Sequence, residues 1–202
     1  AEARFGAGAG KDNVLVVTLG TGVGGAVIIN GRLVRGAAGF AAEIGHINIV
    51  PDGRPCGCGL RGCLERYASG TALGVNGWEL AKFRPDYAAR IIELSGGDQN
   101  TISGKAVTAA AREGDPAALE CYEQLTHWLG VGLADMCALL DPEVIVIAGG
   151  LAEAGAILLA PTRKAFADNL TAGTHRPDIP VVLAEGGQEA GLVGAADLAR
   201  QP

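Results

Sequence analysis

Residues 14–34 read VLVVTLGTGVGGAVIINGRLV, and this stretch decides the fold class of the chain. Residues 14–18 are a continuous apolar run rich in β-branched side chains, which predicts a buried strand. A glycine-rich turn follows at once. Residues 26–34 predict two more strands joined at Asn30 and Gly31, because this dipeptide tolerates the positive φ angles of a type I′ turn. The chain therefore opens with a strand, a glycine turn and a β-hairpin.

The middle of the chain carries shorter and weaker patterns. Residues 47–50 predict a short strand, and residues 64–73 predict a helix. Residues 78–114 predict helices that are interrupted at Pro85 and at residues 95–98, where Ser, Gly, Gly and Asp follow one another.

A long helix is predicted from Asp115 and Pro116, since Asp is a favoured N-cap and Pro suits the first helical position. Apolar residues recur on one face as far as Leu140, and the helix is expected to end before Asp141. The elements expected after it are a strand at 143–148, a helix at 156–170, a strand at 181–184 and a helix from residue 189. The first strands form a hairpin and the later ones alternate with helices, so the sequence predicts an α/β fold with a mixed sheet flanked by helices.

The composition is that of a globular protein with a negative net charge. The chain has 202 residues, of which 49% are hydrophobic, so it can form one large domain or two small ones. The formal charge is −6 and no basic stripe is interleaved with aromatic residues, which argues against a nucleic-acid surface. The longest apolar segment, residues 129–140, carries Asp135, which argues against a membrane span. The first ten residues lack the pattern of a secretory signal, and five cysteines fit a reducing compartment, so we expect a cytoplasmic protein.

One imidazole and three thiols are clustered in residues 46–63, as His46, Cys56, Cys58 and Cys63. These are the donors of a Cys₃His zinc site, and the intervening glycines allow the backbone to turn three thiolates toward one point. A disulfide would have to join Cys56 to Cys58 or leave one thiol unpaired, and it gives His46 no role. Chance clustering and a redox pair are the other interpretations. Four protein ligands leave no open position, so a zinc ion here would be structural.

Two strand-to-glycine junctions, at residues 19–24 and 148–150, are candidate phosphate-binding turns. Backbone N–H groups exposed by glycine can approach phosphate oxygens, and the hydroxyl of Thr21 adds a donor. Each junction alone is equally compatible with an ordinary tight turn.

On these motifs the sequence resembles the ROK family of sugar kinases, open reading frames and repressors. The similarity is carried by TLGTGVGGAVIINGRLVRG at 18–36, EIGH at 43–46, CGCGLRGCLE at 56–65, IVIAGGL at 145–151 and GLVGAADLA at 191–199. It is closest to the glucokinases of actinobacteria. The resemblance implies a two-lobed, actin-like ATPase with ribonuclease-H-like lobes, of which residues 1–202 would be the C-terminal lobe.

The resemblance also implies roles for individual residues. Glu43, His46 and Glu65 match positions that hydrogen-bond sugar hydroxyls, although for the two carboxylates a solvated loop charge is the other interpretation. His46 would bind zinc through one ring nitrogen and face the sugar with the other. The phosphates of the nucleotide are expected to lie against Gly20, Thr21 and Gly22. Its adenosine is expected to lie beside Gly149 and Gly150.

Two elements of the family are missing from these 202 residues. They are the Asp-x-Gly-Gly-Thr phosphate turn and the Asn-Asp pair whose Asp acts as general base. No catalytic residue is therefore expected in this chain, and the base is expected just upstream of Ala1. We expect the N-terminal lobe to be absent and the isolated chain to be inactive, because phosphoryl transfer would lose its base and half of its phosphate cradle.

The favoured function is phosphorylation of glucose, or a related hexose, at its 6-hydroxyl, with Mg-ATP as co-substrate and polyphosphate as another possible donor. The alternative is the effector-binding lobe of a ROK repressor with a helix-turn-helix module upstream. A purely structural zinc module is the third interpretation. The family further suggests a homodimer formed through this lobe. The sequence decides neither between glucose and mannose nor between the two donors.

Overall fold

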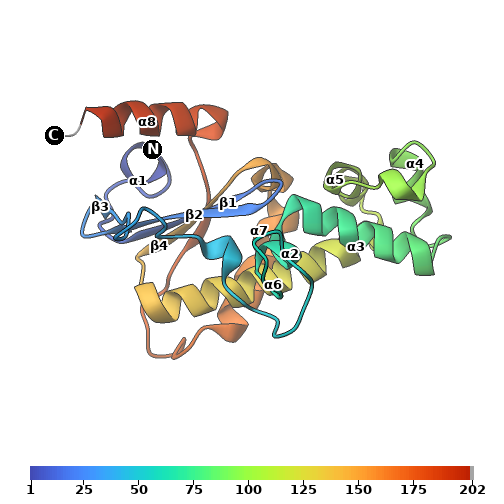
Figure 1. Cartoon of the computed structure of the whole chain (residues 1–202), viewed down its shortest axis with the longest axis horizontal. Coiled ribbons are helices and arrows are strands. Elements are labelled where there is room, and N and C mark those ends of the chain that lie inside the picture. The colour runs from blue at the N-terminus through green and yellow to red at the C-terminus, as the bar shows by residue number, and fades with distance from the viewer. Residues whose placement is uncertain (201–202) are drawn as a thin grey trace.

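The computed structural model describes residues 1–200, and its centre is a five-stranded mixed sheet with the strand order β3-β2-β1-β4-β5 (Figure 1). The strands are β1 (Val14–Leu19), β2 (Val23–Ile29), β3 (Arg32–Leu33), β4 (Val144–Ala148) and β5 (Val181–Leu183). β1 pairs antiparallel with β2 and parallel with β4, and β4 pairs parallel with β5. The predicted mixed sheet is confirmed.

The predicted hairpin is also confirmed, with a shorter glycine turn than expected. Asn30 and Gly31 both have positive φ, 51° and 72°, as a type I′ turn requires. β2 begins at Val23 rather than at residue 26, because Val23 already pairs with Leu19 across the turn. The turn is therefore tight, and the N–H of Gly20 donates to the carbonyl of Gly22 over 3.0 Å.

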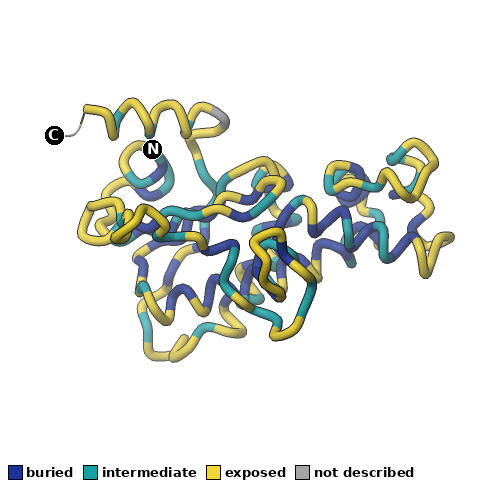
Figure 2. Tube along the Cα trace, in the orientation of Figure 1, coloured by how far each residue is buried: buried dark blue, intermediate teal, exposed yellow. Residues whose placement is uncertain are grey.

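Helices cover both faces of the sheet. The larger core contains Leu15, Val17 and Leu19 of β1 together with residues of α6 (Pro116–Leu140) and α7 (Ala156–Asn169). The alternate residue Val14 points to the other face, where the short helix α1 (Glu2–Phe5) lies and α8 (Ala190–Ala199) follows above it (Figure 1). In Figure 2 the central strands β1 and β4 are mostly buried, whereas β3 and α8 are mostly exposed.

A group of shorter helices extends from one end of the sheet (Figure 1). It is formed by α2 (Glu65–Ala68), α3 (Gly70–Phe83), α4 (Ala89–Leu94) and α5 (Gly104–Arg112). The 3₁₀ turns are η1 (Ile44–His46), η2 (Gln99–Thr101), η3 (Gly150–Ala154) and η4 (Gly187–Glu189). The interruptions expected at Pro85 and at residues 95–98 are confirmed, since α3 and α4 end before them.

The long helix α6 begins and ends where the sequence predicts. The carboxylate of Asp115 accepts the N–H of Ala118 over 2.9 Å, and Asp141 adopts the left-handed conformation with φ 44°. Cys121 and Cys137 are buried in this helix as free thiols. Burial raises the pKa of Cys121 to about 12 and that of Cys137 to about 11, so both are unreactive.

Two local predictions are wrong. The helix expected at 64–73 is broken at Ser69, whose hydroxyl accepts the N–H of Ala72 over 3.0 Å and starts a new helix. Residues 47–50 form no strand, since they share with their neighbour only an isolated bridge between Asn48 and Cys63. The partner segment turns away at Gly62, whose φ is 76°, so no ladder can continue.

Within residues 1–200, no helix is both long enough and apolar enough to cross a lipid bilayer.

Candidate functional site

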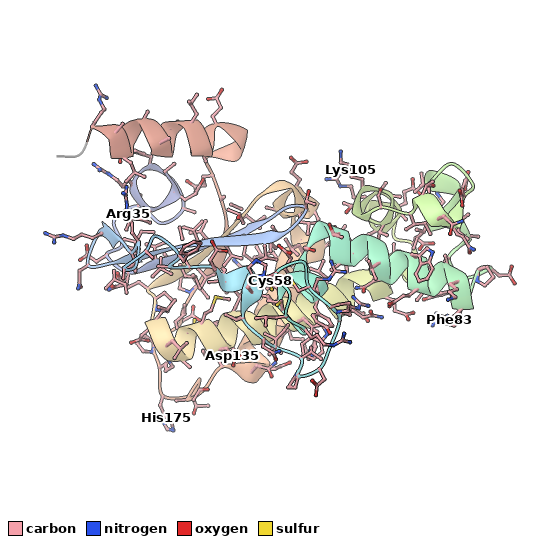
Figure 3. All side chains as sticks on the ribbon, in the orientation of Figure 1. Arg35, Cys58, Phe83, Lys105, Asp135 and His175 are labelled. Carbon is pink, nitrogen blue, oxygen red and sulfur yellow. The ribbon has the colours of Figure 1, made fainter. Side chains whose placement is uncertain are left out.

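The four predicted metal ligands converge in the structure. The donor atoms of His46, Cys56, Cys58 and Cys63 all lie within 4.8 Å of one another. The Sγ of Cys56 lies 3.6 Å from Nδ1 of His46, and the Sγ of Cys58 lies 3.7 Å from that of Cys63. Figure 3 labels Cys58 near the centre of the molecule, next to η1.

Backbone hydrogen bonds shape the loop that carries the thiols. The N–H of Cys56 donates to the carbonyl of Leu60 over 2.8 Å, and the N–H of Gly59 donates to the carbonyl of Cys56 over 3.1 Å. Gly62 has a positive φ, and a Cβ there would overlap the carbonyl of Val50. Only glycine therefore lets the chain return to Cys63.

Arg54 anchors this loop to the helices beside it. The N–H of Arg54 donates to the Tyr67 hydroxyl over 2.7 Å, and its guanidinium lies 5.3 Å from the Tyr67 ring centroid. The same guanidinium donates to Asn76 over 3.0 Å and to Glu79 over 2.7 Å, both on α3. The position of the thiols is thus set by contacts outside the loop as well as within it.

The loop gives its thiols different acidities. The backbone N–H of Leu60 lowers the pKa of the exposed Cys58, because it stabilises the thiolate. Burial raises the pKa of Cys63 to about 12. A cation among the thiols would reverse the effect of burial, because a coordinating thiol is deprotonated.

The geometry fits a tetrahedral metal ion. With Zn–S bonds of about 2.3 Å, a tetrahedron places two thiolates about 3.8 Å apart, close to the 3.7 Å between Cys58 and Cys63. One nitrogen and three sulfurs are a donor set that zinc prefers. These residues can hold such an ion and leave it no open coordination position.

Val23 contacts both of the segments that carry the residues assigned to the sugar by the resemblance. Glu65, the first residue of α2, accepts the N–H of Val23 at its Oε2 over 3.0 Å. Gly45 packs so closely on the carbonyl of Val23 that a Cβ would overlap it. Glu43 and His46 flank Ile44 and Gly45 in the sequence, so the segment that carries them contacts the strand start that Glu65 also contacts.

The two glycine turns lie at one edge of the sheet, because β1 and β4 are parallel neighbours and both end there. The first turn is held by the start of α3. The N–H of Gly70 donates to the carbonyl of Gly20 over 2.8 Å, and the hydroxyl of Thr71 donates to the carbonyl of Thr21 over 2.7 Å. Ligands of α/β proteins commonly bind beyond the carboxyl ends of such strands.

A cavity of about 990 Å³ opens next to these turns. Of the five residues expected at the nucleotide, Gly20, Thr21 and Gly150 line it. Gly149 lies behind the wall, with φ 89° and no room for a Cβ beside the carbonyl of Leu19. Gly22 also lies outside the lining and faces Glu65 instead.

A second wall of this cavity was not predicted from the sequence. It is formed by the starts of α3 and α5 together with η2, and it includes Gly70, Thr71, Asn100, Ser103 and Lys105. Figure 3 labels Lys105 on α5. A local signal did exist, since Ser103 caps α5 by accepting the N–H of Ala106 over 3.4 Å, and a helix start offers free N–H groups to an anion. Ser103 lies far from the glycine turns in the sequence, so the sequence pattern did not indicate that they share a cavity.

A model of the ROK family matches residues 1–202. The chain belongs to the ROK family. The glucokinase of Streptomyces coelicolor is 47% identical over the whole chain. Among solved structures, a ROK glucokinase from Streptomyces griseus in complex with glucose and AMPPNP covers 100% of the chain at 49% identity, with a TM-score of 0.93. A ROK transcriptional regulator, a homologue of the E. coli MLC protein, covers 96% of it at 31% identity and a TM-score of 0.75.

The chain spans only part of these relatives. It covers 63% of the Streptomyces coelicolor glucokinase, 64% of the Streptomyces griseus structure and 47% of the regulator. Over that part, the mixed sheet and its helices match the fold of the ROK glucokinase.

Proposed function

We propose that the chain is the sugar- and nucleotide-binding part of a glucokinase, which transfers a phosphoryl group from ATP to the 6-hydroxyl of glucose or a related hexose. One observation carries the proposal. Glu65, the expected sugar ligand, is hydrogen-bonded to Val23 at the end of the expected phosphate turn, over 3.0 Å. Phosphoryl transfer requires that acceptor and donor be held side by side, and this contact joins the two expected sites.

In this proposal Glu43, His46 and Glu65 bind the sugar hydroxyls. Carboxylates suit the task because each can accept from two adjacent hydroxyls. Nδ1 of His46 faces the thiol of Cys56, so Nε2 is the ring nitrogen that would donate to the sugar.

Gly20, Thr21 and Gly22 would contact the phosphates of ATP, and Gly149 and Gly150 would lie beside its adenosine. The 990 Å³ cavity has the size of a small-molecule site and is lined by three of these five residues. Mg²⁺ bound with the ATP would neutralise part of the phosphate charge. The Streptomyces griseus glucokinase, which binds glucose and AMPPNP, supports the same ligand classes for this chain.

We further propose that residues 1–202 form the C-terminal lobe of a two-lobed kinase, whose other lobe supplies the general-base Asp and the second phosphate turn. The share of the glucokinases that the chain spans supports this. A homodimer through this lobe and a cytoplasmic location, where thiols stay reduced and ATP is available, complete the proposal.

We propose that His46, Cys56, Cys58 and Cys63 hold one structural zinc ion. Convergence of the four donor atoms within 4.8 Å supports it. Elemental analysis of protein purified without added metal should give about one zinc per chain. A content far below one equivalent would contradict the assignment.

A repressor function is the second candidate, and the likeness to the ROK regulator favours it. In that case the same lobe would bind a sugar effector without phosphorylating it. The identity and TM-score are both lower than for the glucokinase, which is why the enzyme is preferred.

The deciding experiment uses the protein together with its upstream lobe. Formation of sugar phosphate is measured with glucose or mannose, and with ATP or polyphosphate. We expect turnover that depends on a hexose and a phosphoryl donor. Sugar binding without any turnover, together with DNA binding, would support the repressor and contradict the kinase.

A further inference from the structure

Glu65 makes a contact that a sugar ligand alone does not need. Its Oε2 accepts the backbone N–H of Val23, which lies 42 positions earlier in the chain and follows the glycine turn directly. Glu65 itself is half-buried at the start of α2. Within residues 1–200, its second oxygen, Oε1, has no protein hydrogen-bond partner, so this oxygen is available to a ligand hydroxyl.

The glycine turn is shaped around this carboxylate. A Cβ on Gly22 would overlap Oε2 and lie 3.0 Å from Cδ of Glu65. The φ of Gly22 lies outside the left-handed region, so the backbone does not itself demand glycine there. A Cβ at position 22 would therefore displace the Glu65 carboxylate from its place beside the turn.

Three hydrogen bonds fix the turn from outside, and they differ in kind. Gly70 and Thr71 hold the carbonyls of Gly20 and Thr21 from α3. Glu65 holds the N–H of Val23 through a charged group, which makes a stronger bond than a neutral acceptor. It is also the only one of the three partners that the proposed function assigns to the sugar.

We propose that Glu65 is a positioning residue that couples the sugar site to the phosphate turn, in addition to binding the sugar. A hydroxyl donating to Oε1 fixes the carboxylate, and the carboxylate fixes Val23 and the turn before it. By linkage, a turn fixed by nucleotide also favours the sugar-binding position of Glu65. This inference rests on the proposed function and deepens it.

The test displaces Glu65 without changing it. Gly22→Ala adds a methyl group that overlaps the carboxylate, whereas Gly191→Ala adds the same group in α8, outside the proposed site, where nothing lies within 4 Å. In the two-lobed protein, calorimetry without nucleotide measures glucose affinity. We expect Gly22→Ala to weaken glucose binding about tenfold or more, the scale of one hydrogen bond to a charged group, and Gly191→Ala to change it less than twofold. Equal glucose affinity in parent and Gly22→Ala would overturn the inference.

A second pair of variants reads the coupling from the nucleotide side. Glu65→Gln keeps an acceptor for the Val23 N–H, and Glu65→Ala removes it. Both should weaken glucose binding, but only Glu65→Ala should weaken AMPPNP binding in the absence of sugar, by about threefold or more. If the role of Glu65 were purely structural, the substitutions would lower the melting temperature, and Glu65→Gln and Glu65→Ala would not differ in AMPPNP affinity.

The failures can be told apart. A parent that binds no hexose contradicts the proposed function and the coupling with it, whereas in a parent that binds hexose the variants decide the coupling by itself. If Glu65→Ala binds AMPPNP as tightly as the parent, the coupling does not exist. Metal content and melting temperature, measured on every variant, identify any that fail to fold.

Discussion

The sheet core and the metal loop of residues 46–63 are held together by different forces. Leu15, Val17 and Ile147 are fully buried and pack against an apolar face of α6, so the core needs no ligand. The loop has little regular structure, exposes Leu60 and Cys58, and is organised by four convergent donors and by Arg54. Its apolar residues Ile47 and Ile49 are only partly buried, at the margin of the core.

This difference explains where the candidate site lies. The core fixes the ends of β1 and β4 by burial, and hydrogen bonds from Gly70, Thr71 and Glu65 then hold the glycine turn that follows β1. The loop fixes His46 and, through Cys63, the start of α2 with Glu65. The two regions meet at Val23, whose N–H bonds Glu65 and whose carbonyl contacts Gly45. Perturbing one region at a time should therefore separate stability from ligand binding.

The largest effect on stability is expected in the core. Leu133→Ala in α6 removes a side chain that is 0% exposed, and it should lower the free energy of unfolding by about 2–5 kcal/mol. Chemical denaturation measures the loss. Leu139→Ala, in the same helix but 85% exposed, is the matched control and should change little. The metal content should be unaltered in both, and a loss of metal in Leu133→Ala would mean that the regions are not separable.

Cys58→Ser should have the opposite pattern, with loss of the metal and a smaller effect on the stability of the core. It removes a metal ligand, so bound zinc should fall to a small fraction of one equivalent and glucose affinity should fall with it. Unfolding of the core should change less than in Leu133→Ala, because Cys58 is exposed and outside the apolar cluster. Cys137→Ala, which removes a thiol buried in α6, should retain the metal. Full metal content in Cys58→Ser would contradict the ligand set.

Arg54→Met tests the link between the loop and the helices. Loss of the bonds to Asn76 and Glu79 should destabilise the protein by about 1 kcal/mol, since the pair is partly exposed. Zinc should still bind but should be lost to a chelator faster than from the parent. Arg61→Met is the control, because the Arg61 side chain donates to the Asp52 carbonyl, which lies within the same loop. Equal rates of zinc loss in the two variants would show that Arg54 anchors nothing.

The smallest effect is expected at the far end of β1 and β4. The backbone N–H groups of Asn13 and Asp12 hold the pKa of Glu143 below its ordinary value of 4.5. A carboxyl with a lower pKa in the folded state contributes stability above its unfolded pKa and loses it as the pH falls through the folded pKa. Glu143→Gln should thus be slightly less stable than the parent at pH 7, and the difference should shrink as the pH falls below the ordinary carboxyl pKa and through the lowered pKa of the folded state.

Thermal unfolding from pH 3 to pH 7 measures this difference. Glu123→Gln, on the exposed side of α6, controls for the loss of one negative charge. A difference for Glu143→Gln that grows as the pH falls would have the wrong sign and would contradict the hydrogen-bonded carboxylate.

The sequence by itself determined the features that depend on neighbouring residues. Asn30 and Gly31 specified the hairpin turn, and Asp115 with Pro116 specified the start of α6, because turn and capping preferences are local. Four metal-binding residues within one loop indicated their own convergence, since the glycines between them allow the backbone to turn their side chains toward one point.

Only the tertiary structure decided the features that depend on distant residues. Ser69 interrupts a segment that is helical by pattern, and Thr71, Ser103 and Lys105 join the glycine turns around one cavity. The bond from Val23 to Glu65 spans 42 positions, and no local preference encodes it. Such contacts form only once the core has packed the ends of β1, β4 and α3 together. Burial of apolar surface determines which segments meet, but it does not determine which polar atoms then lie side by side.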